Sequence, residues 1–288
     1  MKDSLGDRMK SHYEDRFRYK LPRRTYTIIR IDGKAFHTYT RGLARPFDKD
    51  LISDMDETTK YLCKNIQGVK FGYVQSDEIS LLLTDFDDLQ TDMWFDGNLQ
   101  KMVSVAASMA TAQFNQLRLK RKVKENFGNF SNNPMDSEHE FFQLIEKTKQ
   151  AEFDARVFQI SNPTEVENYY IWRQQDATRN SISSVAQSLY SPKELNGQNS
   201  DQQQELIFQK GINWNDYTPR EKRGGFIDKV EKIIQVPRSS HSGISKKGTG
   251  PGVNRNSPTI SCVRNVWESV ECPIFTQERD FITSKIPK

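Results

Sequence analysis

Stretches of apolar residues with two different spacings predict a chain in which strands and helices alternate. Continuous apolar runs bounded by Gly, Pro, Asn or Asp are typical of strands, whereas apolar residues three or four apart are typical of helices. The predicted strands are 26–31, 71–74, 79–83, 153–160 and 225–234. The predicted helices are 50–66, one through 103–117, and a third that begins at the Asn162-Pro163-Thr164-Glu165 capping sequence and extends past Trp172.

The order of these elements predicts the fold class. From 26 to 160 it reads β-α-β-β-α-β, which is the split βαβ arrangement. We therefore expect an α+β protein with an antiparallel sheet, helices on one face of that sheet, and added helical segments.

Segments without a regular pattern are expected to be loops or linkers. The ranges 121–150 and 191–204 are predicted to be loops, and 237–260, rich in Gly, Ser, Pro and Lys, a mobile segment. We expect a catalytic domain over 1–235, with additions that bind RNA, and a basic flexible linker with a C-terminal docking segment over 236–288. A chain cut after Gln235 is expected to keep its fold, unless the apolar residues of 261–286 pack back onto the domain.

The placement of charge says more than its total, which is +4 for 288 residues. Basic residues crowd 118–124, and none of the residues between Lys232 and Trp267 is acidic. Both segments suit contact with phosphate, but a solvated surface explains them equally well. We find no apolar signal core or membrane-spanning stretch, so we expect a cytoplasmic protein without a membrane partner.

The first candidate for chemistry is the sequence Arg30-Ile31-Asp32-Gly33-Lys34-Ala35-Phe36-His37, where a buried strand ends at a carboxylate. Glycine at position 33 is expected to allow a sharp turn and to leave backbone groups free. Such a loop can bind a hard cation through Asp32 and phosphates through successive N–H groups. By itself Asp-Gly is more often an ordinary turn.

The second candidate is Ser76-Asp77-Glu78, at the turn of the predicted hairpin. In a split βαβ sheet this hairpin neighbours the first strand, so Asp32 and Asp77 are expected to converge. Two converging carboxylates suit a pair of Mg²⁺ ions, and they repel each other without a ligand. The alternative is a polar turn with no further role.

Other chemistries find no support in the motifs. The Walker A sequence and the Gly-x-Ser-x-Gly nucleophile elbow are absent from the sequence. His37 lies in the candidate phosphate loop, where a ligand or packing role is favoured over that of a general base.

Several stretches together make the chain similar to the tRNA-histidine guanylyltransferase family, and especially to its bacterial and archaeal guanylyltransferase-like branch. RIDGKAFH and GYVQSDEISLLL carry the resemblance most specifically, and LGDRMKSHYE, KMVSVAASMATAQFN, FDARVF and YYIWRQQDATRNS extend it from residue 5 to about 180. A weaker match continues to about 235.

The resemblance implies a polymerase-like palm that adds nucleotides to the 5′ end of tRNA in the 3′-to-5′ direction, after activation of that end by ATP or GTP. It implies two Mg²⁺ ions bound by Asp32, the Gly33 carbonyl and Asp77, with Glu78 in a supporting catalytic role. The implied nucleotide-binding residues are Arg30, Gly33, Lys34, Ala35, Phe36, His37, Arg45, Asp48, Ser76 and Lys101. The residues expected to bind RNA, from the placement of charge and from the helix around Trp172, are Lys120, Arg121, Lys122, Arg173, Arg179 and Asn180. Relatives assemble as tetramers, which implies a homo-oligomer.

One departure bears on the substrate. Members that add guanylate to histidine tRNA have His-Ile-Asn-Asn where this chain has Thr178-Arg179-Asn180-Ser181, so only Asn180 matches. This favours templated repair of truncated tRNA over guanylate addition to histidine tRNA. Two alternative hypotheses remain from the sequence: a nucleotide cyclase on a similar palm, and an RNA-binding module without activity.

Overall fold

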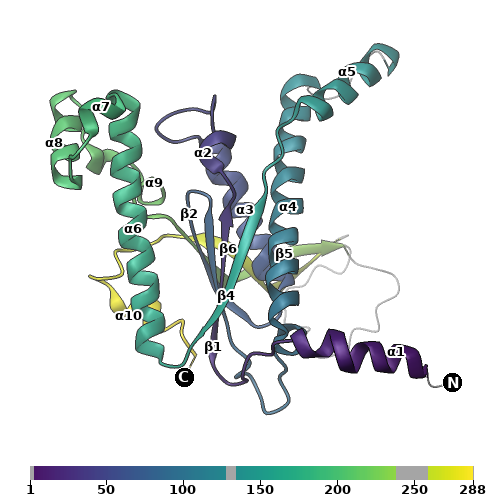
Figure 1. The fold of residues 1–288 in the computed structure, drawn as a ribbon. Helices are drawn as coiled ribbons and strands as arrows, with labels where there is room; N and C mark the ends of the chain where they lie inside the picture. Colours follow the sequence, from purple (N-terminus) through teal and green to yellow (C-terminus); the bar gives the residue numbers. More distant parts are fainter. Residues whose placement is uncertain (1–2, 128–133, 238–258, 288) are drawn as a thin grey trace.

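The computed structural model describes residues 3–127, 134–237 and 259–287, arranged around a six-stranded antiparallel sheet (Figure 1). The strands are β1 (Tyr26–Gly33), β2 (Val69–Gln75), β3 (Glu78–Leu83), β4 (Phe153–Ile160), β5 (Gly225–Pro237) and β6 (Thr259–Val270). Their order across the sheet is β4-β1-β3-β2-β5-β6. Every predicted strand is therefore confirmed, and β6 is an additional one.

The helices also follow the predicted order over the first half of the chain. The longer ones are α3 (Lys49–Asn65), α4 (Leu99–Phe127), α5 (Pro134–Lys147), α6 (Pro163–Leu189) and α8 (Ser200–Gln209). The short ones are α1 (Ser4–Met9), α2 (Phe36–Tyr39), α7 (Pro192–Leu195), α9 (Pro219–Arg223) and α10 (Arg279–Thr283). Single turns complete the set: η1 (Lys10–Glu14), η2 (Asp15–Phe17), η3 (Trp94–Gly97) and η4 (Trp214–Asp216). In the described part of the chain, no helix combines the length and apolar character that crossing a membrane requires.

Helices cover both faces of the sheet, which corrects the expectation of helices on one face. One core contains Ile29 and Leu81 from the strands together with Leu62 of α3 and Phe114 of α4. A second core, on the opposite face, packs strand residues such as Tyr73 against α6. All six residues of β3 are buried, because β3 lies inside the sheet between β1 and β2 and both faces of the sheet are covered.

Two predicted loops are largely helical. α4 continues through the basic residues to Phe127, and α5 occupies 134–147, so the loop at 121–150 is wrong for the residues described. The loop at 191–204 contains α7 and the start of α8, each of which begins with a capping box. These helices were missed because short or solvated helices lack a long apolar stripe, although Ser191-x-x-Glu194 is a recognisable start signal.

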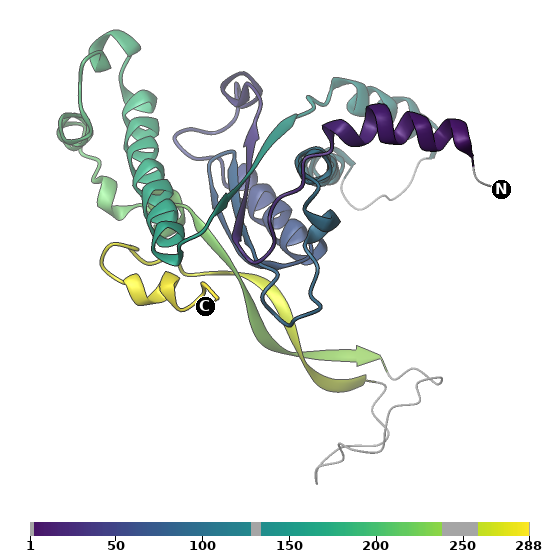
Figure 2. The same ribbon diagram turned by 60° about the horizontal axis from the view of Figure 1, so that its bottom comes forward.

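The C-terminal residues are part of the fold. β5 runs through the expected domain boundary to Pro237 and pairs with β6 along its length, which Figure 2 shows as a projecting ribbon. Beyond β6, buried residues that include Phe275 and Ile282 join the core on the α6 face. Gln174 of α6 fixes this segment by donating to the Pro273 carbonyl at 2.7 Å and accepting from the Phe275 N–H at 2.8 Å. The linker expected at 237–260 falls largely outside the described residues.

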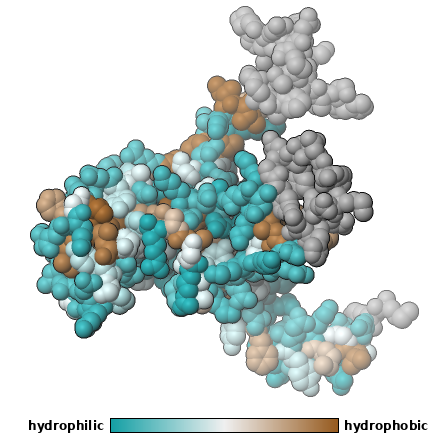
Figure 3. All heavy atoms as spheres, turned by 90° about the horizontal axis from the view of Figure 1, so that it is seen from above, coloured by the Kyte–Doolittle hydropathy of each residue, from teal (hydrophilic) through white to brown (hydrophobic). Residues whose placement is uncertain are grey.

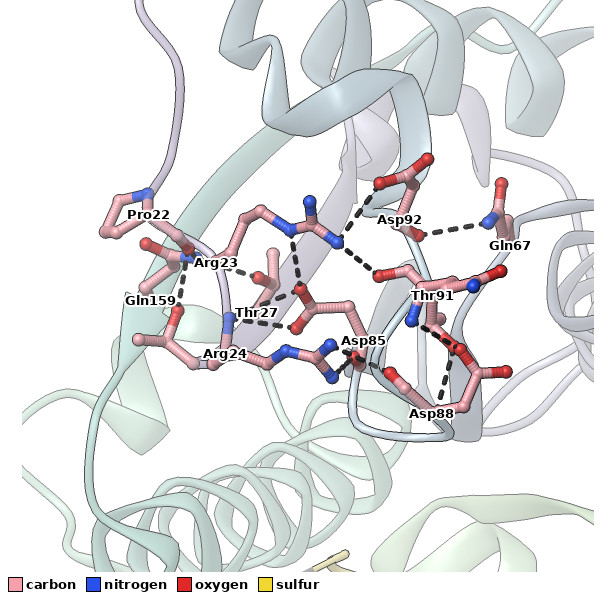
Figure 4. Close-up of polar contacts among 12 residues, drawn as sticks. Pro22, Arg23, Arg24, Thr27, Gln67, Asp85, Asp88, Thr91, Asp92 and Gln159 are labelled. Carbon is pink, nitrogen blue, oxygen red and sulfur yellow. Dashed lines mark hydrogen bonds and ion pairs between the residues drawn. The ribbon is translucent and has the colours of Figure 1, made fainter.

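A buried aspartate fixes the start of β1 (Figure 4). Asp85, only 1% exposed, accepts from the backbone N–H of Arg24 at 3.0 Å and lies 3.6 Å from the Arg23 guanidinium. Arg23 in turn donates to the Thr91 carbonyl. The cluster around Asp85 therefore fixes one end of β1, and Asp32 lies near the other end of the same strand.

Candidate active site

The sheet brings Asp32 and Asp77 to one cavity, as predicted from the order of the strands. β1 pairs with β3 through Ile31 and Ile79, so the end of β1 lies beside the β2–β3 turn. Asp32, Asp77 and Glu78 line one cavity of about 310 Å³. Its opposite wall is α6, which contributes residues the sequence analysis did not single out. They are Asp176, Ser183, Ser184 and Gln187, in addition to Arg173 and Asn180.

The turn after Asp32 is built differently from the prediction. β1 extends through Gly33, and the left-handed residue is Ala35, with φ of 50°. Gly33 is needed because the Phe36 ring packs onto it, and an added Cβ would lie 2.2 Å from that ring. Ser76 in the hairpin turn also has a positive φ, of 46°. Such backbone strain in both loops of one cavity is typical of functional sites.

Only part of the predicted phosphate loop is free to bind a ligand. The Lys34 N–H donates to the Glu152 carbonyl at 2.8 Å, and the Lys34 ammonium pairs with the Glu152 carboxylate. The N–H groups of Ala35, Phe36 and His37 have no hydrogen-bond acceptor in the described part of the chain. The Phe36 side chain is in the core, 5.8 Å from the Phe114 ring centroid, so only its backbone can contact a phosphate.

The electrostatics of the cavity favour a cation. Burial, with a further contribution from Asp32, raises the pKa of Asp77 from 3.8 to about 6. Arg156 of β4 lies near the other carboxylate, with Nη2 3.8 Å from Asp32 Oδ2. No group of three or more His, Cys, Asp or Glu side chains among the described residues could hold a metal ion. The donors are thus two carboxylates and nearby backbone carbonyls, a set that fits Mg²⁺, which keeps waters and takes substrate phosphates as ligands.

Glu78 and Arg173 form a buried ion pair, whereas from the sequence Glu78 was expected to support the metal site and Arg173 to bind RNA. Arg173 Nε and Nη2 lie 2.7 and 2.9 Å from the two Glu78 oxygens, and Nη2 also contacts Asp176 at 2.7 Å. Burial raises the pKa of Glu78, and the Arg173 guanidinium opposes that shift. The pair joins the hairpin to α6, and Arg173, 5% exposed, is not presented to an RNA backbone in this structure.

A second cavity, of about 290 Å³, adjoins the first. His37, Arg45, Asp48 and Ser76 all line it, so four predicted nucleotide-binding residues meet here. The Asp48 carboxylate also caps α3, accepting from the Leu51 N–H at 2.8 Å. Apolar side chains from the segment before α3 and the first turn of α3 make up much of the remaining wall.

Two predicted nucleotide-binding residues lie apart from these cavities. Lys101 is in the first turn of α4, and two residues earlier the Leu99 N–H donates to the carbonyl of Tyr19, which precedes β1. Asn115 on the same helix is bonded to Ala151, level with the end of β1. At 1.5 Å per residue, α4 separates Lys101 from Asn115 by about 20 Å along the helix axis. Figure 1 shows α4 running along the length of the sheet. Arg30 is in β1, two residues before Asp32, and its buried Nε has no hydrogen-bond partner among the described residues.

The predicted RNA-binding residues have unequal surroundings. Lys120 is exposed on α4, whereas Arg121 pairs with Asp50 and Asp54 of α3 at 2.7 and 2.8 Å. Arg179 is exposed and pairs with Asp176 at 3.1 Å, and Asn180 lines both cavities. Figure 3, the view from above Figure 1, shows a mainly hydrophilic surface with small separate hydrophobic patches.

Comparison with known proteins decides the family. The family model described as tRNAHis guanylyltransferase matches residues 6–161. The chain belongs to this family. It is a nucleotidyltransferase, and the resemblance drawn from the RIDGKAFH and QSDE motifs is confirmed.

Individual relatives agree with this family assignment. A structure of a bacterial tRNA(His) guanylyltransferase-like protein in complex with ATP is 39% identical, covers 98% of this chain and 99% of its own, and has a TM-score of 0.74. The corresponding complex with GTP has a TM-score of 0.67. A protein of Acanthamoeba polyphaga mimivirus is 29% identical over 84% of this chain and 82% of its own length. The tRNA(His) guanylyltransferase of Saccharomyces cerevisiae is 24% identical, covering 73% of this chain and 85% of its own.

Proposed function

We propose that this tRNA(His) guanylyltransferase family member adds nucleotides to the 5′ end of truncated tRNA in the 3′-to-5′ direction, copying the opposite strand. The observation that carries the proposal is the convergence of Asp32 and Asp77 in a cavity that adjoins a second one of similar size. The β-α-β-β-α-β unit that holds them has the arrangement expected of a polymerase-like palm. The similar bacterial proteins that bind ATP and GTP support both triphosphates as substrates.

The metal site we propose uses Asp32, Asp77 and the Gly33 carbonyl for two Mg²⁺ ions. When bound, the ions would lower the pKa of an attacking hydroxyl and stabilise the leaving pyrophosphate. Glu78 would act indirectly, because its carboxylate is taken up by Arg173 and holds the hairpin in place. Asp77, whose pKa burial raises to about 6 without a cation, would be fully ionised beside one.

The nucleotide would span the two cavities. Its phosphates would lie near the carboxylates and the free N–H groups of Ala35 to His37. Its base would occupy the cavity lined by Arg45 and Phe47. Lys101 is too far along α4 to reach these phosphates from within the same chain.

Residues 178–181 support repair rather than a role confined to histidine tRNA. Ser181 is buried and accepts from the Trp214 indole at 3.0 Å, which anchors η4 to α6. Arg179 is exposed, so its guanidinium can contact a phosphate of the acceptor stem. A surface that recognises the shape of the acceptor stem is sufficient when pairing selects the nucleotide.

The proposal is tested with a 5′-truncated, 5′-phosphorylated tRNA, Mg²⁺ and all four triphosphates, followed by sizing of the product. We expect extension to full length, and a changed template base should change the nucleotide added. Guanylate addition to histidine tRNA alone, whatever base lies opposite, would contradict the repair reading. Incubation with triphosphates alone is the control for a cyclase, which would form a cyclic product without RNA.

A further inference from the structure

The two cavities meet at a set of uncharged hydrogen-bonding side chains. The residues that line both of them are Gln75, Ser76, Asn180, Ser184 and Gln187. The last three are spaced four and three residues apart, so they lie on one face of α6. The carboxylates lie on one side of this junction, and the partly apolar cavity lies on the other.

Gln75 is the most unusual member of this set. It is the last residue of β2 and is 4% exposed. Its Nε2 donates to Glu78 Oε1 at 3.5 Å, and Glu78 is held in turn by Arg173 at 2.7 and 2.9 Å. A carboxylate only accepts hydrogen bonds, so this contact determines which end of the amide is the nitrogen.

The amide oxygen of Gln75 is consequently directed away from Glu78 and has no hydrogen-bond partner within the described ranges. A buried acceptor without a donor is costly, and native proteins rarely keep one without a reason. A bound ligand with a hydroxyl or amino group at the junction would satisfy it.

The order of groups in a nucleotide limits which donor this can be. Phosphate oxygens are acceptors, so they cannot pair with Oε1, and the amino groups of a base lie at the far end from the phosphates. The ribose lies between them and carries hydroxyl donors. We propose that Gln75 is a specificity residue that accepts a hydrogen bond from a ribose hydroxyl of the bound nucleotide, with the Glu78–Arg173 pair as its positioning group.

This inference rests on the proposed function, since it assumes that a triphosphate spans the two cavities. The test measures dissociation constants of the full-length protein, with Mg²⁺ present, for ATP, 2′-deoxy-ATP and 3′-deoxy-ATP. We expect one deoxy analogue to bind about 3- to 30-fold more weakly than ATP. Gln75→Met, which removes the acceptor at similar size, should bind ATP and that analogue equally.

Gln203→Met is the matched control, because Gln203 lines a third cavity and neither of the two described above. It should keep the wild-type ratio between ATP and the analogue. Gln75→Asn is a second variant, which keeps an amide but withdraws its oxygen, and it should also lose the discrimination. The analogue series on the wild-type protein needs no variant and therefore holds even if Gln75→Met fails to fold.

Equal binding of all three nucleotides by the wild type would overturn the inference and leave the proposed function intact. So would a Gln75→Met protein that keeps the wild-type ratio, or one whose preference changes between ATP and GTP instead, which would indicate base recognition. A protein that binds neither ATP nor GTP would contradict the proposed function itself, and the inference with it.

Discussion

At the residue scale, the site depends on two carboxylates that the fold brings together at a cost. Asp77 is partly buried and close to Asp32, so its ionised form is disfavoured without a counter-charge. Glu78 avoids the same cost by pairing with Arg173. Neighbouring acids in one hairpin therefore have different roles, one free to bind a cation and one structural.

Replacing Asp32 or Asp77 by Asn should reduce nucleotide transfer on the order of 100-fold or more, because a neutral amide is a poor ligand for Mg²⁺. Single-turnover extension of truncated tRNA measures the loss, and circular dichroism checks the fold. Asp87→Asn is the matched control, since Asp87 is exposed and pairs with Lys70 at 2.5 Å on a loop outside both cavities. Near-wild-type transfer in either variant would remove the assignment.

The metal-free protein should lose stability as the pH rises from about 4 to about 6. The pKa of Asp77 in the folded state, about 6, exceeds its ordinary value of 3.8. Protonated Asp77 therefore contributes fully to the free energy of unfolding below pH 3.8, and this contribution is lost as the pH rises to about 6. The loss is at most about 3 kcal/mol. Urea unfolding across this range in EDTA measures it, and Asp77→Asn should flatten the slope. An unchanged slope in the variant would assign the pH dependence to other groups.

At the element scale, the ends of β1 have different roles, with an anchor at one end and the chemistry at the other. Asp85 binds the backbone just before β1, while Asp32 projects at the opposite end into the cavity beside α6. The basic turns of α4 are likewise divided, because Arg118 and Arg121 bind Asp54 of α3 while Lys120 is exposed.

Asp85→Ala should lower the free energy of unfolding by about 1–3 kcal/mol, because the Arg24 N–H loses its acceptor. Chemical denaturation measures the change. Transfer per folded molecule should stay close to wild type, since the cluster is remote from the cavity. Asp88→Ala, on the exposed neighbouring loop, is the control and should cost less. Equal effects of the two substitutions would show that burial of Asp85 is unimportant.

Neutralising Lys120 and Lys122 together, by substitution with Gln, should weaken tRNA binding and reduce the salt slope by roughly one per lysine. Filter binding across a salt series measures both. Lys64→Gln, at the C-terminal end of α3, is the control and should leave the slope unchanged. Arg121→Gln should instead lower stability, because Arg121 bridges Asp50 and Asp54. A slope unaffected by the double substitution would identify this surface as merely solvated.

At the scale of the whole molecule, the last segment of the chain completes the core over α6. Phe275 and Ile282 are fully buried there, and Tyr26 at the start of β1 donates to the Pro287 carbonyl at 2.7 Å. The C-terminal segment therefore supports the helix that forms one wall of the site.

Cutting the chain after Gln235 should yield insoluble or strongly destabilised protein, because β5 loses its partner and one core loses its cover. Solubility and thermal unfolding measure the outcome. Phe275→Ala should cost about 3–5 kcal/mol, whereas Phe208→Ala, with 64% of Phe208 exposed, should change stability little. A truncated protein with wild-type stability would instead support the expectation from the sequence that residues 1–235 keep their fold without the C-terminal segment.

Local pattern was enough to predict the β-α-β-β-α-β unit and the loops at Asp32 and Asp77. Buried strands need apolar runs, and both loops interrupt such runs with acids and turn residues. Local pattern did not predict the solvated end of α4 or the short helices after residue 190, because none of them has a long apolar stripe. The short helices α7 and α8 are stabilised by their caps and by packing on α6.

Only the tertiary structure decided which polar side chains meet. The spacing in the sequence placed Asp32 and Asp77 together, but it held no information that α6, about a hundred residues later, would cover that face and bring Arg173 to Glu78. It also gave no sign that α4 carries Lys101 away from the phosphates, or that Ala35 and Ser76 take left-handed conformations. Such contacts depend on how helices and strands pack against each other. An unpaired buried charge is costly, so each buried charge lies next to a partner that the packed elements bring to it.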